Sequence, residues 1–211
     1  MSDIPLTKRS VMTLFSDPRS PNSHRVRLVA KEKDIPMDVI EVDPDNMPED
    51  LMELNPYGTL PTLVDRELIL YDAQVIIEYL DERYPHPPLM SVDPISKARS
   101  RQQLRQIETE WYPLVEVIVR NENAEDVKRA RRDLTERLIQ MIPVFAHKPF
   151  FMSEDYTLVD ASLAVLLWRL PSLGIELPKS AKAITDYSNR LMEREMFNES
   201  LSDDELDMND A

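Results

Sequence analysis

The fold of this chain is decided by the stretch Asn55-Pro56-Tyr57-Gly58-Thr59-Leu60-Pro61-Thr62-Leu63-Val64. This stretch holds two prolines and one of the chain's two glycines, directly before an apolar run. Gly58 can adopt a positive φ, and a cis peptide ordinarily occurs before proline, usually in a tight turn. Thr62-Leu63-Val64 is typical of the start of a β-strand. The residues by themselves predict a proline-rich turn that leads into a central strand.

Composition and charge exclude several classes of function. The 211 residues suffice for one large or two small domains with a sizeable core. Because the chain has no cysteine, it has no disulfide, no thiol nucleophile and no cysteine-ligated zinc. Its two glycines, at positions 58 and 174, exclude the glycine-rich loops that bind dinucleotides and nucleoside triphosphates. The formal net charge of −14 argues against direct nucleic acid binding.

Other expectations concern location and ligands. The apolar runs are too short to cross a membrane, and no charged N-terminus precedes an apolar signal segment, so we expect a cytoplasmic protein. His24 and His147 have no companions at ligand spacing, so we expect no metal site. We also expect no cofactor. From Glu193 to the C-terminus the chain carries eight acidic residues and one basic residue. Such a run is typical of a solvated tail, and we predict a disordered acidic tail over residues 199–211.

The first part of the chain alternates between strand and helix patterns. We expect residues 1–10 to be unstructured. The pattern of the residues that follow predicts the order βαβαββα. Ser20-Pro21 and Asp72 each have the chemistry of a helix start. The predicted strands cover residues 11–15, 37–42, 62–65 and 68–71, and the predicted helices cover 21–33, 48–54 and 72–83. This order is typical of a thioredoxin-like domain, which we assign to residues 10–85.

The second part of the chain predicts helices only. Residues 86–91 are rich in proline and are expected to form a linker. Apolar residues spaced by threes and fours predict an all-α domain over residues 92–198, so the fold class is α+β. Thr157 and Asp160 form a capping-box pattern before a strongly apolar run. The predicted helices cover residues 94–120 with a kink at Pro113, 124–145, 157 to an end near Gly174, and 180–197.

Four local patterns occur in the order found in glutathione transferase-like proteins, and the chain resembles that superfamily over about residues 10–198. The patterns are Ser20-Pro21-Asn22-Ser23, the loop at 55–63, Tyr71-Asp72-Ala73, and the capping box at 157–160. The resemblance implies the glutathione transferase fold, with a thioredoxin-like N-terminal domain and an all-α C-terminal domain. It also implies a homodimer.

The same resemblance identifies positions that hold glutathione in relatives. In relatives a hydroxyl or thiol at the position of Ser20 contacts the glutathione sulfur, and the residue before cis-Pro61, here Leu60, offers its backbone. Asp72-Ala73 lies where relatives commonly have Glu-Ser or Asp-Ser. Ala73 has no hydroxyl, and a missing hydrogen bond to a charged group costs about 1.5–3 kcal/mol. We therefore interpret these positions as a vestigial glutathione site with no catalytic residue, although Ser20 also suffices as a plain helix cap.

The segment from Glu78 to Met90 closely resembles the stringent starvation protein A family of proteobacteria. That resemblance implies a transcription regulator of the stress response, which associates with RNA polymerase holoenzyme and its primary sigma factor without transferase activity. It implies a partner-binding role for Pro85, His86 and Pro87, to which we add Pro88. Ser91-Val92-Asp93 departs from the family pattern, in which an aromatic residue lies nearby. The residues alone, without the resemblance, favour a stiff interdomain linker.

Two other functions are consistent with the sequence. One is a glutathione-dependent transferase or isomerase that uses Ser20, and retention on immobilised glutathione would distinguish it. The other is a transferase-fold scaffold in a different assembly. The basic run at residues 128–132 is most simply the solvated face of a helix.

Overall fold

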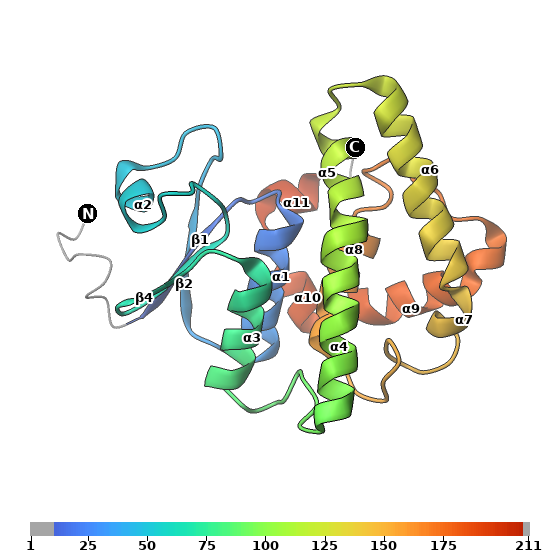
Figure 1. Ribbon diagram of the computed structural model, residues 1–211, viewed down its shortest axis with the longest axis horizontal. Helices are drawn as coiled ribbons and strands as arrows, with labels where there is room; N and C mark the ends of the chain where they lie inside the picture. The colour runs from blue at the N-terminus through green and yellow to red at the C-terminus, as the bar shows by residue number, and fades with distance from the viewer. Residues whose placement is uncertain (1–10, 209–211) are drawn as a thin grey trace. The chain divides into compact units, whose positions relative to one another are not determined.

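The computed structural model describes residues 11–208 (Figure 1). The predictions for residues 1–10 and for the last three positions lie outside the described residues. The described chain divides into two compact units, one formed by residues 11–87 together with residues 199–208, and the other by residues 88–198. The boundary falls inside the range predicted as the linker. Within the described range, no helix is long and apolar enough to span a membrane.

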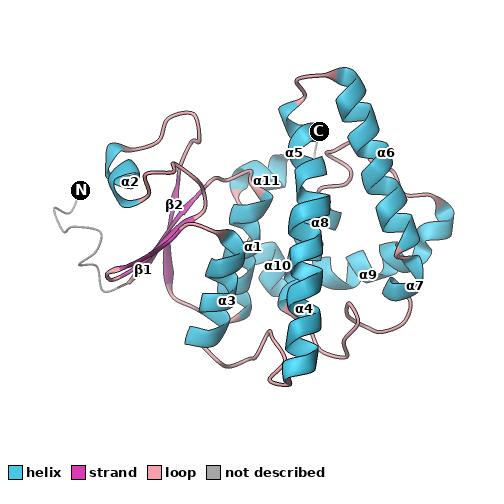
Figure 2. Ribbon diagram, in the orientation of Figure 1, coloured by secondary structure: helices cyan, strands magenta, loops and turns pink. Residues whose placement is uncertain are grey.

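The first unit is built on a mixed four-stranded sheet with the order β2-β1-β3-β4 (Figure 2). Central strand β1 runs parallel to β2 and antiparallel to β3, with Leu14 opposite both Val39 and Leu63. A two-residue turn joins β3 to β4, and Arg66 in this turn has a φ of 57°. The strands are β1 (Met12–Ser16), β2 (Met37–Glu41), β3 (Thr62–Asp65) and β4 (Leu68–Leu70). All four predicted strands are confirmed within two residues.

Helices cover both faces of this sheet. In Figure 2, α1 (Pro21–Glu32) and α3 (Ala73–Arg83) lie side by side on one face, and α2 (Glu49–Leu54) lies on the other. Alternation along the strands explains this arrangement, because successive side chains point to opposite faces. The core beneath α2 contains Phe15, Val42, Leu51 and Val64.

The segment after residue 198 corrects the prediction of a disordered tail. Residues Asp203–Met208 form helix α11, which lies beside α1 in the first unit (Figure 1). Ser202 and Glu205 cap this helix reciprocally. The Glu205 N–H donates to Ser202 Oγ at 3.2 Å, and the Ser202 N–H donates to the Glu205 carboxylate at 3.0 Å. The Glu205 side chain is fully buried and pairs with Arg27, so the acidic run is not simply a solvated tail.

The second unit is all-helical. Helix α8 (Leu158–Trp168) is its most buried element, because every residue from Leu158 to Leu167 is buried. Its capping box is formed as predicted by Thr157 and Asp160. Helix α8 packs against α4 (Pro94–Gln106) and α9 (Lys182–Met192). The unit also contains α5 (Tyr112–Arg120), α6 (Ala124–Gln140), α7 (Ile142–Phe145) and most of α10 (Glu195–Glu199).

Several helix boundaries differ from the prediction. The long helix is interrupted by a π-helical turn at Ile107–Trp111, just before Pro113, which cannot donate a backbone hydrogen bond. Helix α8 ends at Trp168, earlier than the predicted end near Gly174. Gly174, with a φ of 67°, instead closes the following turn. The ranges predicted as single helices over 124–145 and 180–197 are each divided, at Met141 in the first and at Glu193 in the second.

Candidate functional site

Three loops of the first unit meet at one end of its sheet. Strand register places Phe15 opposite Thr62 and Leu63 opposite Leu70. The loop after β1, the loop before β3 and the loop after β4 therefore lie at the same end. These loops carry the residues predicted to form the vestigial glutathione site: Ser20, Leu60, Pro61, Asp72 and Ala73.

Asn55 organises the loop before β3 from inside. The side chain is fully buried, and its Nδ2 lies 3.0 Å from both the Thr59 carbonyl oxygen and Thr62 Oγ1. Its Oδ1 accepts from the Tyr57 N–H at 3.1 Å. The Leu60–Pro61 peptide is cis, as expected for this loop, and Gly58 has a φ of 57°. A buried amide thus fixes the path of the backbone into β3.

The polar groups at this end of the sheet are used for helix capping. Ser20 Oγ accepts from the Asn22 N–H at 3.2 Å, and the Asp72 carboxylate accepts from the Val75 N–H at 3.0 Å. The Ser20 hydroxyl proton can still be donated. Ala73 is the first residue of α3 and offers no side-chain donor. The N-terminus of α3 itself remains a site of positive potential.

The segment from Pro85 to Pro88 is exposed at all four residues. The His86–Pro87 peptide is cis. Next to the segment, the Arg83 guanidinium lies 5.4 Å from the centre of the half-buried Tyr84 ring. An exposed segment therefore follows directly after the contact between Arg83 and Tyr84.

A buried lysine lies behind this segment. Lys33 Nζ donates to the Pro87 carbonyl oxygen at 2.6 Å and to Asp81 Oδ1 at 2.7 Å. The side chain of Lys33 is 0% exposed and that of Asp81 is 8% exposed. We did not identify either residue from the sequence. No local pattern could have indicated them, because Lys33 is separated from its two partners by 48 and 54 residues.

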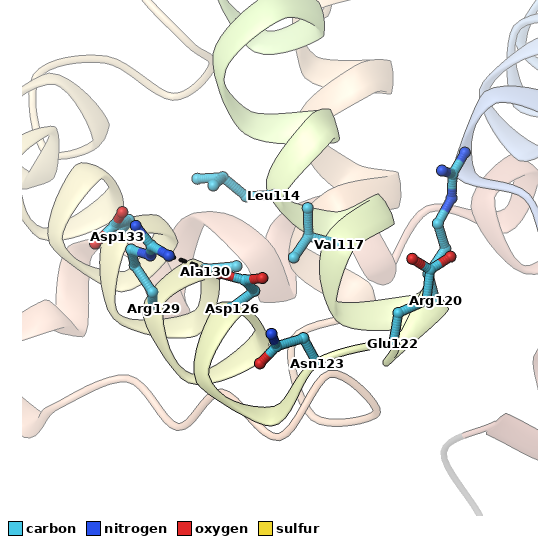
Figure 3. Close-up of a pocket in the computed structure, with 9 residues that line it drawn as sticks. All are labelled: Leu114, Val117, Arg120, Glu122, Asn123, Asp126, Arg129, Ala130 and Asp133. Carbon is cyan, nitrogen blue, oxygen red and sulfur yellow. Dashed lines mark hydrogen bonds and ion pairs between the residues drawn. The ribbon is translucent and has the colours of Figure 1, made fainter.

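The second unit has a pocket between α5 and α6 with a volume of about 330 Å³ (Figure 3). Its apolar lining comes from Leu114, Val117 and Ala130. At its rim Arg129 pairs with Asp126 at 2.6 Å, the contact dashed in Figure 3. None of the residues predicted to function lines this pocket.

One acidic group in the core of the second unit has a raised pKa. Burial raises the pKa of Asp160 above its ordinary value of 3.8, although four hydrogen bonds oppose the shift. The donors are the Phe151 N–H at 2.7 Å, the Tyr187 hydroxyl at 2.6 Å, and the N–H and hydroxyl of Thr157, both at 2.8 Å. The Thr157 contacts cap α8, and the other two tie the start of α8 to neighbouring segments, so we interpret Asp160 as structural. Within residues 11–208, no group of three or more histidine, aspartate or glutamate side chains is arranged to hold a metal ion.

Comparison with family models divides the chain as its fold does. The glutathione S-transferase N-terminal domain matches residues 14–88, and the glutathione S-transferase C-terminal domain matches residues 97–195. Among solved structures, a glutathione S-transferase from Rhodospirillum rubrum is similar with a TM-score of 0.84. The alignment has 20% identity and covers 92% of this chain and 93% of that one. FzlA from C. crescentus has a TM-score of 0.81 at 24% identity, with 92% of each chain covered.

Curated relatives match over nearly the whole chain. The stringent starvation protein A homolog of Coxiella burnetii is 46% identical, covering 98% of this chain and 99% of that protein. The homolog of Pasteurella multocida is 48% identical over 92% of each. Glutathione S-transferase Z1 of Arabidopsis thaliana is 40% identical over only 39% of this chain and 38% of that protein. The chain therefore belongs to the stringent starvation protein A family and carries the two domains of the glutathione S-transferase fold.

Proposed function

We propose that the chain is a transcription regulator of the stress and stationary-phase response, without transferase activity. It acts in the cytoplasm as a homodimer, by protein contact with RNA polymerase holoenzyme and its primary sigma factor. Family membership supports this role, because the stringent starvation protein A resemblance implies association with polymerase. The net charge of −14 is consistent with a role that does not require direct binding to nucleic acid.

One observation carries the proposal. Pro85, His86 and Pro87 are all exposed, while the Pro87 carbonyl oxygen accepts a hydrogen bond from the buried ammonium of Lys33. Proline fixes φ, so two of the three residues lose little backbone freedom when a partner binds. A segment that is already ordered binds at a smaller entropic cost than a flexible one. The two proline rings and the imidazole thus form a compact surface suited to a protein partner.

The other end of the first unit supports the absence of transferase activity. Ala73 cannot donate the side-chain hydrogen bond that relatives use for the γ-glutamyl carboxylate. Ser20 caps α1, so a structural role is sufficient to explain a hydroxyl at this position. We therefore propose that Ser20, Leu60, Pro61, Asp72 and Ala73 are vestigial glutathione-site positions.

A second candidate is a glutathione-dependent transferase or isomerase that uses Ser20. It is favoured by the meeting of the three loops at one end of the sheet, where Leu60 and the start of α3 remain available. Retention on immobilised glutathione distinguishes the two candidates. Strong retention reversed by free glutathione would favour the enzyme.

Co-elution with RNA polymerase holoenzyme tests the proposal. The wild type is compared with a variant carrying Pro85→Ala, His86→Ala and Pro87→Ala. A matched control carries Glu176→Ala, Pro178→Ala and Lys179→Ala, which alter an exposed proline-containing loop in the second unit. Circular dichroism verifies that all three proteins are folded.

We expect the wild type and the control to co-elute with the holoenzyme and the Pro85–Pro87 variant to elute alone. If all three co-elute, polymerase is the partner but the contact surface lies elsewhere. If the wild type elutes alone, the regulator proposal is overturned and glutathione binding becomes the deciding measurement.

A further inference from the structure

Proline restricts φ within the Pro85–Pro87 segment, but the segment has few backbone donors that could anchor it to the rest of the unit. Prolines lack a backbone N–H, so among these three residues only His86 has a backbone donor. Order in the segment must therefore come largely from groups that donate to its carbonyl oxygens. Lys33 provides such a group, because its Nζ lies 2.6 Å from the Pro87 carbonyl oxygen.

The ammonium of Lys33 is fixed in turn by Asp81. Lys33 follows the last turn of α1, and Asp81 lies near the end of α3. The 2.7 Å contact between them joins the ends of two helices that pack together. The Pro87 carbonyl thus meets a charged donor whose position is set by two helices.

Fold stability alone does not explain this arrangement. A buried ion pair is often no more stabilising than two apolar side chains of similar volume, because both charges lose their hydration. An apolar pair could fill the same space but could not donate to a carbonyl oxygen. The distinctive contribution of Lys33 and Asp81 is therefore a directional bond to the exposed segment.

We infer that the Lys33–Asp81 pair is a positioning device, which holds Pro85–Pro87 in the shape that the protein partner recognises. This inference rests on the proposed function for its partner. Without the pair, the same exposed side chains remain but lie on a mobile backbone. Ordering that backbone again on binding costs conformational entropy, so we expect the affinity for the partner to fall about tenfold.

The test uses the full chain with Lys33→Met and Asp81→Leu together, which keeps the net charge and replaces the pair by apolar side chains. A matched control carries Lys182→Met and Asp186→Leu, at an exposed ion pair of the second unit. Two quantities are measured for each folded protein: the NMR order parameter of the His86 amide and the affinity for RNA polymerase holoenzyme. If the double variant does not fold, Lys33→Met with Asp81→Asn replaces it.

The inference predicts that the His86 order parameter falls from about 0.85 to below about 0.6 in the double variant. It also predicts an affinity about tenfold lower than that of the wild type and the control. An unchanged order parameter would overturn the inference, because the pair would not be holding the segment. A lower order parameter with unchanged affinity would also overturn it, because the partner would not require that shape.

If the proposed function is wrong, the same experiment gives a different result. If the wild type does not bind the holoenzyme at all, the proposed partner is wrong. The order parameter then still decides whether Lys33 and Asp81 position the segment.

Discussion

The guanidinium of Arg27 lies 2.5 Å from the carboxylate of Glu205, and both side chains are buried. Arg27 belongs to α1 and Glu205 to α11, 178 residues further along the chain. Arg27 also donates to Ser16 Oγ at 2.6 Å and to the Ser200 carbonyl oxygen at 3.0 Å. This one side chain therefore ties the C-terminal segment to the end of β1.

Replacement of Glu205 by glutamine tests whether this contact stabilises the fold. Glu205→Gln removes the carboxylate that neutralises Arg27, and loss of one partner of a buried ion pair costs about 3–5 kcal/mol. Urea unfolding should show a decrease of that size in the free energy of unfolding. The control is Glu199→Gln. Glu199 pairs with Lys31 at a half-exposed position, so this substitution should lower the free energy of unfolding by less than about 1 kcal/mol. Equal, small effects in both variants would mean that α11 is not docked in solution.

Substitution of Tyr187 should give a pH-dependent effect. Burial, together with the charge of Asp160, raises the pKa of Tyr187 well above its ordinary value of 10.0. As the pH rises through 10.0, the unfolded chain loses this proton while the folded protein keeps it, so wild-type stability falls. Tyr187→Phe lacks this titration. It also removes the hydroxyl that donates to Asp160 at 2.6 Å, which should lower the free energy of unfolding by about 1–3 kcal/mol near pH 7.

The free energy of unfolding of Tyr187→Phe should therefore lie furthest below that of the wild type at pH values under 10, and the difference should shrink above pH 10. Urea unfolding at about pH 7 and about pH 11 measures this change. Tyr57→Phe is the control, because Tyr57 is 72% exposed and should give a small difference at both pH values. A deficit for Tyr187→Phe that grows with pH would contradict the assignment.

Local chemistry made much of the fold predictable from the sequence. Ser20, Asp72 and Thr157 each cap a helix by bonding to residues two or three positions away, so their roles are visible in short patterns. The strands of the first unit likewise follow from short apolar runs bounded by turns. Gly174 was assigned wrongly as a helix end because glycine indicates a positive φ without indicating which turn requires it.

Contacts distant in sequence could not be predicted in this way. The docking of Glu205 depends on Arg27. Nothing in the sequence alone distinguishes either residue from a charged residue on the surface. A local signal did exist, since Ser202-Asp203-Asp204-Glu205 has the capping-box pattern, but the surrounding acidic run favoured a solvated tail. Lys33 and Asp81 gave no signal at all, because their importance arises only when α1 and α3 pack together.

Ala73→Ser tests the interpretation of the glutathione site. A hydroxyl at the start of α3 would restore the missing donor, and the expected gain of about 1.5–3 kcal/mol corresponds to roughly ten- to hundredfold tighter binding of glutathione. Isothermal titration calorimetry on both proteins measures the change. Ala98→Ser, at an exposed position of α4, provides the control. Tight binding by the wild type without improvement in Ala73→Ser would show that the site does not depend on this donor.

Gly174→Ala tests the turn after α8. The φ of 67° is unfavourable for any residue with a Cβ, and an added Cβ would lie 3.3 Å from the Arg131 guanidinium. We expect the free energy of unfolding to fall by about 1–2 kcal/mol. The comparison is Ala98→Gly, which removes a Cβ from an exposed helical position and should cost about 1 kcal/mol or less. A Gly174→Ala protein as stable as the wild type would contradict the claim that this turn requires a residue without a Cβ.

Site-specific cross-linking to RNA polymerase holoenzyme tests the central claim most directly. Because the chain has no cysteine, Glu82→Cys places a single photoreactive label beside the Pro85–Pro87 surface, and Lys179→Cys places one on an exposed turn of the second unit. We predict that a polymerase core subunit or the primary sigma factor is captured from position 82, with little capture from position 179. Capture from position 179 alone, or from neither position, would contradict the proposal that Pro85–Pro87 contacts the polymerase.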